Sequence, residues 1–581
     1  MRFLRFPLLA AGAVLVPAFV VGALPWLSGD DPAQTVLRAR SAEQELDPAV
    51  LAAIRREAGI PDDPLTGALS WLGGAVRGDF GRSWVSGVPV SESVGPAIGV
   101  SVTLALVAAL VSLVCALLVL APSLRRAARG TGGVGRGAVA VGAVLAALPE
   151  FLLAAGLLVV VAVHWRLAPT SGWTGPANMP LPALALGLPA AGALSRVLAS
   201  AIDGALSEPW VRVWRANGVR RRVVLRAVLR RAVAVTVPQL VLLFVGLLGS
   251  GIVVETVFAI PGLGATALHA VLAQDLPVVQ GCVIVLALLG LAFGGVGVLA
   301  HRWMLGPALR GAGLPQSTSD SGGSARWALA AAGVLAVAVV AGLLRDPSAI
   351  SLTDRLAPPT AAHPFGTDAL GRDLLARFGH GALLSIGGSL VIGTISLVIG
   401  VVVGMTRARA GVADVLNAVP PVLAGIVVAA VAGPGMAGAL VAVGAVAWIP
   451  LAVHTRTLVA EVRDAGFVRA ARASGAGRAH VARRHLVPSV LPPVLRHALI
   501  RLPHNALALA GLGYLGLAAP HDSPEWGAIL AQSLDYAETA PWAVAFPTAG
   551  LTLLGLTAAL TPAHPADTPT PHDRARAPRL R

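Results

Sequence analysis

The sequence predicts an all-α, polytopic membrane protein, and three observations lead to this class. First, 56% of its 581 residues are hydrophobic and only 13% are charged, whereas soluble domains carry roughly 25% charged residues. Second, apolar stretches of about 20 residues, the length needed to cross a bilayer, recur along the whole chain. Third, arginines gather in alternate connections between these stretches, as is typical of loops that stay in the cytoplasm.

The apolar stretches predict twelve membrane-spanning helices. The first has a basic start, but its apolar run is longer than the roughly 7–15 residues of a signal-peptide core, so we expect a retained span. The eleventh is the most polar of the set, because it contains Arg496, His497, Arg501 and His504. The twelve expected spans lie near 7–26, 98–121, 137–163, 181–200, 234–256, 278–300, 327–344, 382–405, 412–432, 436–455, 490–513 and 541–561.

The arginine distribution also predicts the orientation of the chain. With the N-terminus in the cytoplasm, the arginine-rich connections 122–136, 196–233, 406–411 and 456–487 all lie inside, in agreement with the positive-inside rule. The long loop 27–96 then lies outside, and it is net negative, with six arginines against ten acidic residues. We therefore expect a multi-pass protein whose N- and C-termini are both cytoplasmic.

The chain divides into two halves of similar plan. Residues 306–326 are rich in Gly, Ser and Pro, which is typical of a flexible linker. They separate a first six-span half, 1–305, from a second, 327–561, and the Pro- and Arg-rich tail 562–581 is expected to be disordered. Two parallel repeats in a transporter predict a pseudo-two-fold axis along the membrane normal, with the solute path between the halves.

Composition excludes several kinds of site. The net charge of +15 comes from arginine alone, because the chain contains no lysine. A phosphate-binding P-loop needs its lysine to reach the phosphates, so this chain does not hydrolyse ATP by itself. The two cysteines, Cys115 and Cys282, lie inside apolar runs and are expected to be buried thiols rather than metal ligands or a disulfide. Nucleic-acid binding would need a folded basic soluble domain, and none is expected.

Two basic loops, at about 205–231 and 461–488, have matching patterns. Each begins with an aromatic residue followed by Val-Arg, continues to "RANG" or "RASG", and resumes as a second basic amphipathic run after Gly218 or Gly475. A helix, a glycine and a second helix are what a short interfacial helix joined to a span requires. Binding of anionic lipid headgroups is the alternative explanation for the arginines. Such binding does not explain why both loops carry a glycine at the same place.

The two loops resemble the cytoplasmic coupling loops of ABC importer permeases. In that family two alanines precede a glycine and, further along, a proline. The residues that match are Ala470, Ala471, Gly475 and Pro488 in the second loop and Ala216 and Gly218 in the first. Arg469 stands where the family has a glutamate, and Arg215 and Arg472, three residues before the glycines, are candidates for contact with an ATPase.

Longer motifs extend this resemblance over most of the chain. "RGDFGRS" at 77–83, "VVETVFAIPGLG" at 253–264 and "DLPVVQG" at 275–281 make the first half similar to one permease subunit of dipeptide and oligopeptide importers. "HPFGTDALGRDLLARFGHGALLSI" at 363–386 and "SPEWGAIL" at 523–530 make the second half similar to the partner subunit. The resemblance therefore implies a type I ABC importer permease fold, with two usually separate subunits fused in one chain.

The resemblance also implies partners and a function. The chain would be the permease of a bacterial cell-membrane importer for di- or oligopeptides, or for a related solute such as a nickel chelate or a sugar. Two cytoplasmic ATPase subunits, which carry the ATP and Mg, would dock on the coupling loops, and an extracytoplasmic binding protein would deliver the solute. No cofactor is expected on this chain. A stand-alone secondary transporter or channel is the alternative, and it would need coupling-ion carboxylates near the midplane.

Two further groups of residues are candidates for function. Glu255, Arg501, His504 and Asn505 lie in or beside expected spans and are candidates for the solute pathway or a gate, because ionisable groups within a membrane are usually functional. A structural hydrogen-bonding role for Glu255, and burial of the others between helices, remain alternatives. Before the eighth span, Asp368, Arg372 and Asp373 are candidates for contact with the binding protein, or else for capping and pairing within their own loop.

Overall fold

The computed structural model shows a helical protein that agrees in class with the sequence prediction. It describes residues 18–19, 21–27, 31–40, 47–57, 59–61, 63–129, 134–304, 325–406, 421–520 and 522–560. Within these ranges β-type pairing is limited to two isolated bridges, Arg82 with Pro89 and Thr367 with Asp373. Most of the expected linker 306–326 and all of the expected tail 562–581 lie outside the described residues, so their flexibility stays a prediction. The last two linker residues, Ala325 and Arg326, instead begin helix α15.

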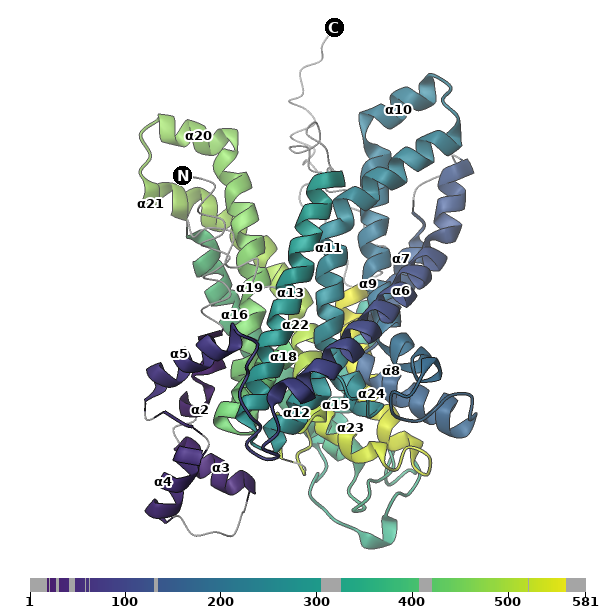
Figure 1. Cartoon of the computed structure of the whole chain (residues 1–581). Helices are drawn as coiled ribbons and strands as arrows, with labels where there is room; N and C mark the ends of the chain where they lie inside the picture. The colour runs from purple at the N-terminus through teal and green to yellow at the C-terminus, as the bar shows by residue number, and fades with distance from the viewer. Residues whose placement is uncertain are drawn as a thin grey trace.

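The described helices run through both expected halves (Figure 1). In chain order they are α2 (Leu24–Leu27), α3 (Pro32–Arg40), α4 (Pro48–Glu57), α5 (Pro64–Ala75), α6 (Val90–Arg129), α7 (Arg136–Ala147), α8 (Glu150–Leu157), α9 (Pro180–Ser207), α10 (Pro209–Ala216), α11 (Arg221–Val257), α12 (Leu263–Leu272), α13 (Leu276–Met304), α15 (Ala325–Leu343), α16 (Leu374–Met405), α18 (Pro421–Ala432), α19 (Met436–Asp464), α20 (Gly466–Ala473), α21 (Arg478–Val481), α22 (Val487–Tyr514), α23 (Trp526–Leu534) and α24 (Pro541–Leu560). Two π-helical segments, Leu158–His164 and Ala482–Leu486, extend α8 and join α21 to α22.

Among the described residues, seven helices are long and apolar enough to cross a membrane, and a bent pair makes an eighth candidate. The seven are in α6, α9, α11, α13, α15, α16 and α19, and the bent pair is α7 with α8. The expected eleventh span is one continuous helix, α22, whose arginines and histidines lower its hydropathy. The expected ninth and twelfth spans are represented by the shorter apolar helices α18 and α24, and most of the first lies outside the described residues.

The order of elements in the first half recurs in the second. In each, a long helix (α9 or α19) packs against an earlier one (α6 or α16) and against the next long helix (α11 or α22). A short apolar helix, α12 or α23, then leads to the last helix of the series, α13 or α24. Helix α18 packs against α11, α12 and α13, and α24 packs against α7. The two parts of the chain therefore share one core.

Small residues allow the helices to approach closely, as membrane helix packing generally requires. At Gly192 of α9, an added Cβ would meet the backbone of Ala146 in α7. At Gly404 of α16, it would meet Thr455 of α19. At both glycines the backbones of the two helices approach each other closely, so α9 packs tightly on α7 and α16 packs tightly on α19.

The span over 137–163 is broken at Leu148–Pro149. Proline disfavours helical geometry in the residue before it, and Leu148 accordingly adopts ψ 122°. Helices α7 and α8 meet there at an angle of 81°. The bend places Glu150 in the first turn of α8, where the helix dipole favours an acidic side chain.

Among its described residues, the expected outer loop 27–96 contains the helices α3, α4 and α5, and α6 begins within it at Val90. Helix α5 begins with a recognisable capping pattern: the Asp63 side chain accepts a hydrogen bond from the Thr66 N–H at 2.9 Å, and Pro64 is the first helical residue. In Figure 1, α3 and α4 lie at the opposite end of the molecule from α10 and α20.

Candidate functional site

Two exposed eight-residue helices, α10 and α20, stand at the same end of the molecule and on opposite sides of it (Figure 1). A single residue separates each of them from the long helix before it, α9 or α19. This residue is Glu208 or Ala465, and its backbone is extended. Each buries one valine, Val211 or Val468, as its third residue. The helices therefore expose most of their surface while one side chain anchors them.

Both helices end in the same hydrogen-bonded turn. The N–H of Gly218 donates to the carbonyl of Arg215, and the next N–H donates to the carbonyl of Trp214, over 3.2 and 3.0 Å. In α20, the N–H of Gly475 donates to the carbonyl of Arg472, and the next N–H to that of Ala471, each over 3.0 Å. This is the Schellman pattern, which needs a left-handed residue after the helix. Gly218 and Gly475 supply it with φ of 72° and 87°.

The residues expected in the coupling loops lie mostly on the exposed surfaces of these helices. Arg215, Ala216 and Gly218 are exposed on α10, and Ala470, Arg472 and Gly475 are exposed on or just after α20, with Ala471 half-buried. Pro488 is the second residue of α22, directly after the π-helical segment Ala482–Leu486. The structure thus gathers the residues of each loop into one surface, and keeps the two surfaces apart.

The two surfaces are held differently. Glu208 accepts a hydrogen bond from the indole N–H of Trp210 at 2.5 Å and an ion-pair contact from Arg231 of α11 at 3.2 Å. A groove of about 380 Å³ beside this helix is lined by Arg215, Gly218 and neighbouring arginines. In the second loop, Ala465 stands at the position of Glu208, so this ion pair has no counterpart. The buried valine of this loop, Val468, packs with Val481 and Leu486.

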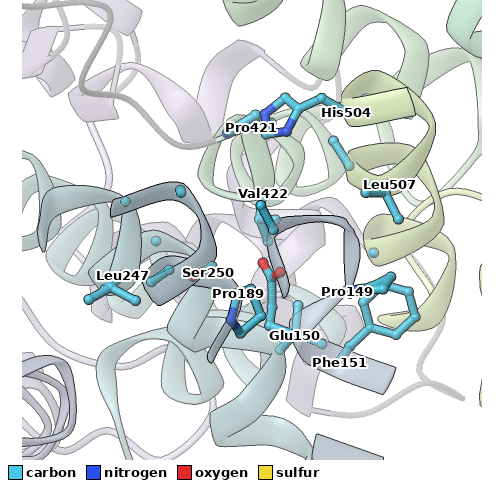
Figure 2. Close-up of a pocket in the computed structure, with 18 of the residues that line it drawn as sticks. Pro149, Glu150, Phe151, Pro189, Leu247, Ser250, Pro421, Val422, His504 and Leu507 are labelled. Atoms are coloured by element: carbon cyan, nitrogen blue, oxygen red, sulfur yellow. The ribbon is translucent and has the colours of Figure 1, made fainter. Parts of the chain in front are cut away.

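A cavity of about 570 Å³ lies between the two parts of the chain (Figure 2). Its walls come from α8, α9 and α11 on one side and from α18, α19 and α22 on the other. Arg501, His504 and Asn505 line it, whereas Glu255 does not. Of the four residues expected in a pathway, the structure therefore brings three together.

The cavity is lined by one acidic side chain, Glu150, and two basic ones, Arg501 and His504. Figure 2 shows the carboxylate of Glu150 pointing into the space between the segments, with His504 across from it. Arg501 lies one helical turn before His504. Four prolines, Pro149, Pro189, Pro421 and Pro450, contribute to walls that are otherwise mainly apolar.

Glu255 is instead part of a buried hydrogen-bond set outside this cavity. It is 1% exposed and accepts hydrogen bonds from the Ser101 hydroxyl at 2.5 Å and from the N–H groups of Gly264 and Ala265 at 2.9 and 3.1 Å. The carboxylate therefore caps α12 and ties it to α6. The position favours the structural alternative for Glu255.

Glu525 forms the counterpart in the second half. Its carboxylate accepts from the Ser385 hydroxyl at 2.8 Å and from the Ala528 N–H at 3.0 Å, so it caps α23 and ties it to α16. In both sets an added Cβ at a glycine, Gly262 or Gly513, would occupy the place of the carboxylate. Sequence reasoning did not identify Glu525 as such a residue, because glutamate is not among the residue types that usually cap a helix at this position.

The candidates for a binding-protein contact form an internal network. Asp368 accepts from Arg372 at 2.7 Å and from the buried Arg377 at 2.6 Å, and Asp373 accepts from Arg345 at 2.6 Å. Burial would raise the pKa of Asp368, but the hydrogen bonds and charges of Arg372 and Arg377 outweigh it and lower that pKa. The network fixes the loop before α16 against α23. A contact with another protein stays a prediction.

The described residues contain no group of three or more His, Cys, Asp or Glu side chains placed to hold a metal ion. Both cysteines are free thiols, Cys115 partly exposed and Cys282 buried.

With this geometry established, comparison with known proteins gives a consistent result. The chain matches the family described as "Binding-protein-dependent transport system inner membrane component" over residues 127–305 and again over residues 396–561. The two segments together cover more than half of the sequence.

Individual relatives agree with the family match. The chain is 30% identical over 307 residues to the metal-staphylopine import system permease protein of Staphylococcus aureus strain Mu50, covering 53% of this chain and 96% of that protein. It is 37% identical over 218 residues to the probable D,D-dipeptide transport system permease protein of Escherichia coli K12, covering 36% of this chain and 73% of the relative. A dipeptide transport system permease protein of Alkalihalophilus pseudofirmus is 33% identical over 223 residues, with the same two coverages.

Proposed function

The chain belongs to the family of binding-protein-dependent transport system inner membrane components and is the permease of an ABC importer rather than its ATPase, and we propose that it unites both permease halves in one polypeptide. Two observations support the union: the family matches twice along the chain, and the order of helices around α9 recurs around α19. In this proposal the halves are residues 1–305 and 327–561, joined by 306–326. They contain twelve spans related by a pseudo-two-fold axis along the membrane normal.

The ATPase partner of the family would act through α10 and α20. The observation that carries this assignment is the shared Schellman turn at Gly218 and Gly475, on two helices at the same end of the molecule. Two ATPase subunits, one on each helix, would approach each other when they bind ATP. Arg215 and Arg472 would contact them, and the helices would transmit the movement into α9, α11, α19 and α22.

The sidedness follows from this assignment. The end with α10 and α20 is cytoplasmic, together with both termini. The end with α3, α4 and the loop before α16 faces the binding protein. Asp368 and Asp373 are buried, so they would support the contact with the binding protein indirectly, by holding that loop in shape. Arg372 would contact the binding protein through the part of its side chain that is accessible. Lipid surrounds the apolar helices, and no nucleic acid takes part.

The cavity between α8, α9, α11, α18, α19 and α22 is the proposed solute pathway. The relatives are named for import of dipeptides and of metal-staphylopine. We propose a solute of the same two kinds, a short peptide or an amino-acid-derived metal chelate. Closure of the ATPases would expose this cavity alternately to each side of the membrane.

Substitution of the turn glycines tests the coupling assignment. Gly218 and Gly475 have open space around the missing Cβ, so Gly→Val there acts only through the left-handed φ, at a cost of about 1–2 kcal/mol or more. We expect loss of co-purification with the ATPase and of ATP-driven uptake. Gly477→Val is a matched control, because Gly477 also has open space but a φ of −66°.

Intact complexes in both glycine variants would remove the coupling assignment. The stand-alone transporter is tested by the same preparation: uptake by the purified chain in vesicles without any ATPase would favour it over the importer.

A further inference from the structure

We infer that the cavity between the halves is a binding site for a small dipolar solute, whose ammonium group faces Glu150 and whose carboxylate faces Arg501 and His504. The inference rests on the proposed function, because it names the chemistry of the solute that this pathway takes. It adds a recognition residue, Glu150, that neither the family match nor the names of the relatives assign.

The opposite charges come from opposite sides of the cavity. Glu150 belongs to the first turn of α8, in the first half, and Arg501 and His504 belong to α22, in the second. Residues three apart on a helix lie on the same face, so the guanidinium and the imidazole form one basic wall. A solute between them bridges the two halves.

The bonding of Glu150 and Arg501 differs from that of the structural acids nearby. Glu255 and Glu525 each accept hydrogen bonds from a serine and from backbone N–H groups. By contrast, the Glu150 carboxylate accepts a hydrogen bond from its own backbone N–H and, among the described residues, from no other group, and the buried Nε of Arg501 has no hydrogen-bond partner there. Charged groups at membrane depth are expensive unless paired or solvated. A dipolar solute satisfies both at once.

The size and the walls of the cavity fit the same solute. Its volume of about 570 Å³ lies within the range of roughly 300–1,000 Å³ that holds small molecules. Pro149, Pro189, Pro421 and Pro450 line it, and proline has no N–H to donate. Apart from Glu150, Arg501 and His504, the polar side chains that line the cavity are those of Ser250 and Asn505, so the rest of the solute meets mainly apolar walls. Such a site tolerates varied side chains between fixed end groups.

Equilibrium binding of radiolabelled alanyl-alanine to the purified, nucleotide-free complex of this chain with its ATPase subunits tests the inference. We expect Glu150→Gln and Arg501→Gln each to weaken binding about tenfold, which corresponds to about 1.4 kcal/mol. The double variant should weaken it about a hundredfold, since contributions from separate contacts add. If the double variant binds no more weakly than either single variant, the two side chains interact with each other rather than with separate ends of the solute, and the inference fails.

Modified solutes identify which end each residue recognises. N-acetyl-alanyl-alanine lacks the ammonium. On the unmodified complex it should compete about tenfold less well than alanyl-alanine. On the Glu150→Gln complex the two peptides should compete equally well. A metal–histidine chelate has its amino group bound to the metal. If the chelate competes better than the dipeptide, the ammonium contact to Glu150 is wrong.

Matched variants separate loss of a contact from loss of structure. Arg496→Gln on α22 and Glu461→Gln on α19 change exposed charges outside the cavity and should bind alanyl-alanine as the unmodified complex does. Arg501→Lys keeps the positive charge and should recover most of the affinity that Arg501→Gln loses. Equal losses in Arg501→Lys and Arg501→Gln would overturn a charge-based contact.

ATP-driven uptake of the same dipeptide, with the binding protein present, distinguishes the two levels of the proposal. If the dipeptide is taken up but its binding depends on neither its ammonium nor its carboxylate, this inference alone is overturned. Binding without any ATP-dependent uptake overturns the importer itself.

Discussion

The Ser385 hydroxyl of α16 donates a hydrogen bond to the carboxylate of Glu525 at 2.8 Å and accepts one from the first N–H of α23 at 3.3 Å. The Ser101 hydroxyl of α6 does the same with Glu255 and the first N–H of α12, at 2.5 and 2.8 Å. Glu525 is the N-cap of its short helix, whereas Glu255 comes from the end of the preceding long helix. The same serine–carboxylate bridge is thus built from two different positions in the chain.

Ser385→Ala should lower the thermal stability of the purified protein. The change removes a hydrogen bond to a buried carboxylate, an interaction that contributes about 1.5–3 kcal/mol. Thermal unfolding followed by tryptophan fluorescence measures the shift. Ser389→Ala is the control, because the Ser389 hydroxyl donates to the Ile386 carbonyl of its own helix, which keeps its helical partner. Equal shifts in both variants would contradict a special role for the bridge.

Gly513→Ala should displace the Glu525 carboxylate and loosen α23 from α22. The added Cβ would fall on the carboxylate, and overpacking of this kind costs about 1–3 kcal/mol. Gly511→Ala lies on the same helix where an added Cβ meets nothing within 4 Å, so its stability should stay close to that of the unmodified protein. Protease sensitivity of the segment around Glu525, compared between the two variants, checks the expectation. A Gly511→Ala variant as sensitive as Gly513→Ala would refute it.

Asp368 should make the outer loop sensitive to acid. Its pKa is lowered in the folded protein from the ordinary value of 3.8, so the folded state binds its proton less readily than the unfolded chain does. The stabilisation is therefore complete above the ordinary pKa and is lost as the pH falls through the lower folded value. Thermal unfolding between pH 7 and pH 3 should show the loss.

Asp368→Asn should remove that part of the acid sensitivity and be less stable at pH 7. Arg377, whose side chain is 2% exposed, would lose its 2.6 Å ion pair, and breaking a buried pair costs about 3–5 kcal/mol. An Asp368→Asn protein with the acid profile of the unmodified chain would show that other carboxylates control the transition.

The sidedness is testable with single cysteines in a Cys115→Ser background, since Cys282 is fully buried. Arg472→Cys, on exposed α20, should react with a membrane-impermeant maleimide only after cells are opened. Ala361→Cys, exposed in the loop before α16, should react in intact cells. The reverse pattern would invert the orientation.

Local patterns in the sequence predict the features whose causes are local. Helices α10 and α20 are an example: a glycine after a short amphipathic run predicts a left-handed residue, and Gly218 and Gly475 both have a positive φ. The apolar stretches likewise predict the long helices, because a span must satisfy its own backbone.

Contacts between distant residues were not predictable in the same way. Ser101 and Glu255 are 154 positions apart, and Ser385 and Glu525 are 140 apart, so no spacing rule connects them. For Glu255 both a gate and a structural role were open, and its partners became visible only with α12 and α6 in place. Glu150 is one of the few acidic residues within the expected spans, and Leu148–Pro149 in the same apolar run predicts the bend that turns it into the cavity.

The presence of both family segments in one polypeptide has a genetic consequence. In an importer built from separate identical subunits, one mutation alters both docking sites. In this chain a substitution at Gly218 alters one of the two proposed docking sites and leaves the other, at Gly475, unchanged in the same molecule. The Glu208–Arg231 ion pair exists beside α10, while Ala465 stands at the equivalent place before α20. On the proposed docking of one ATPase subunit at each helix, selection can therefore alter the two docking surfaces independently within one gene.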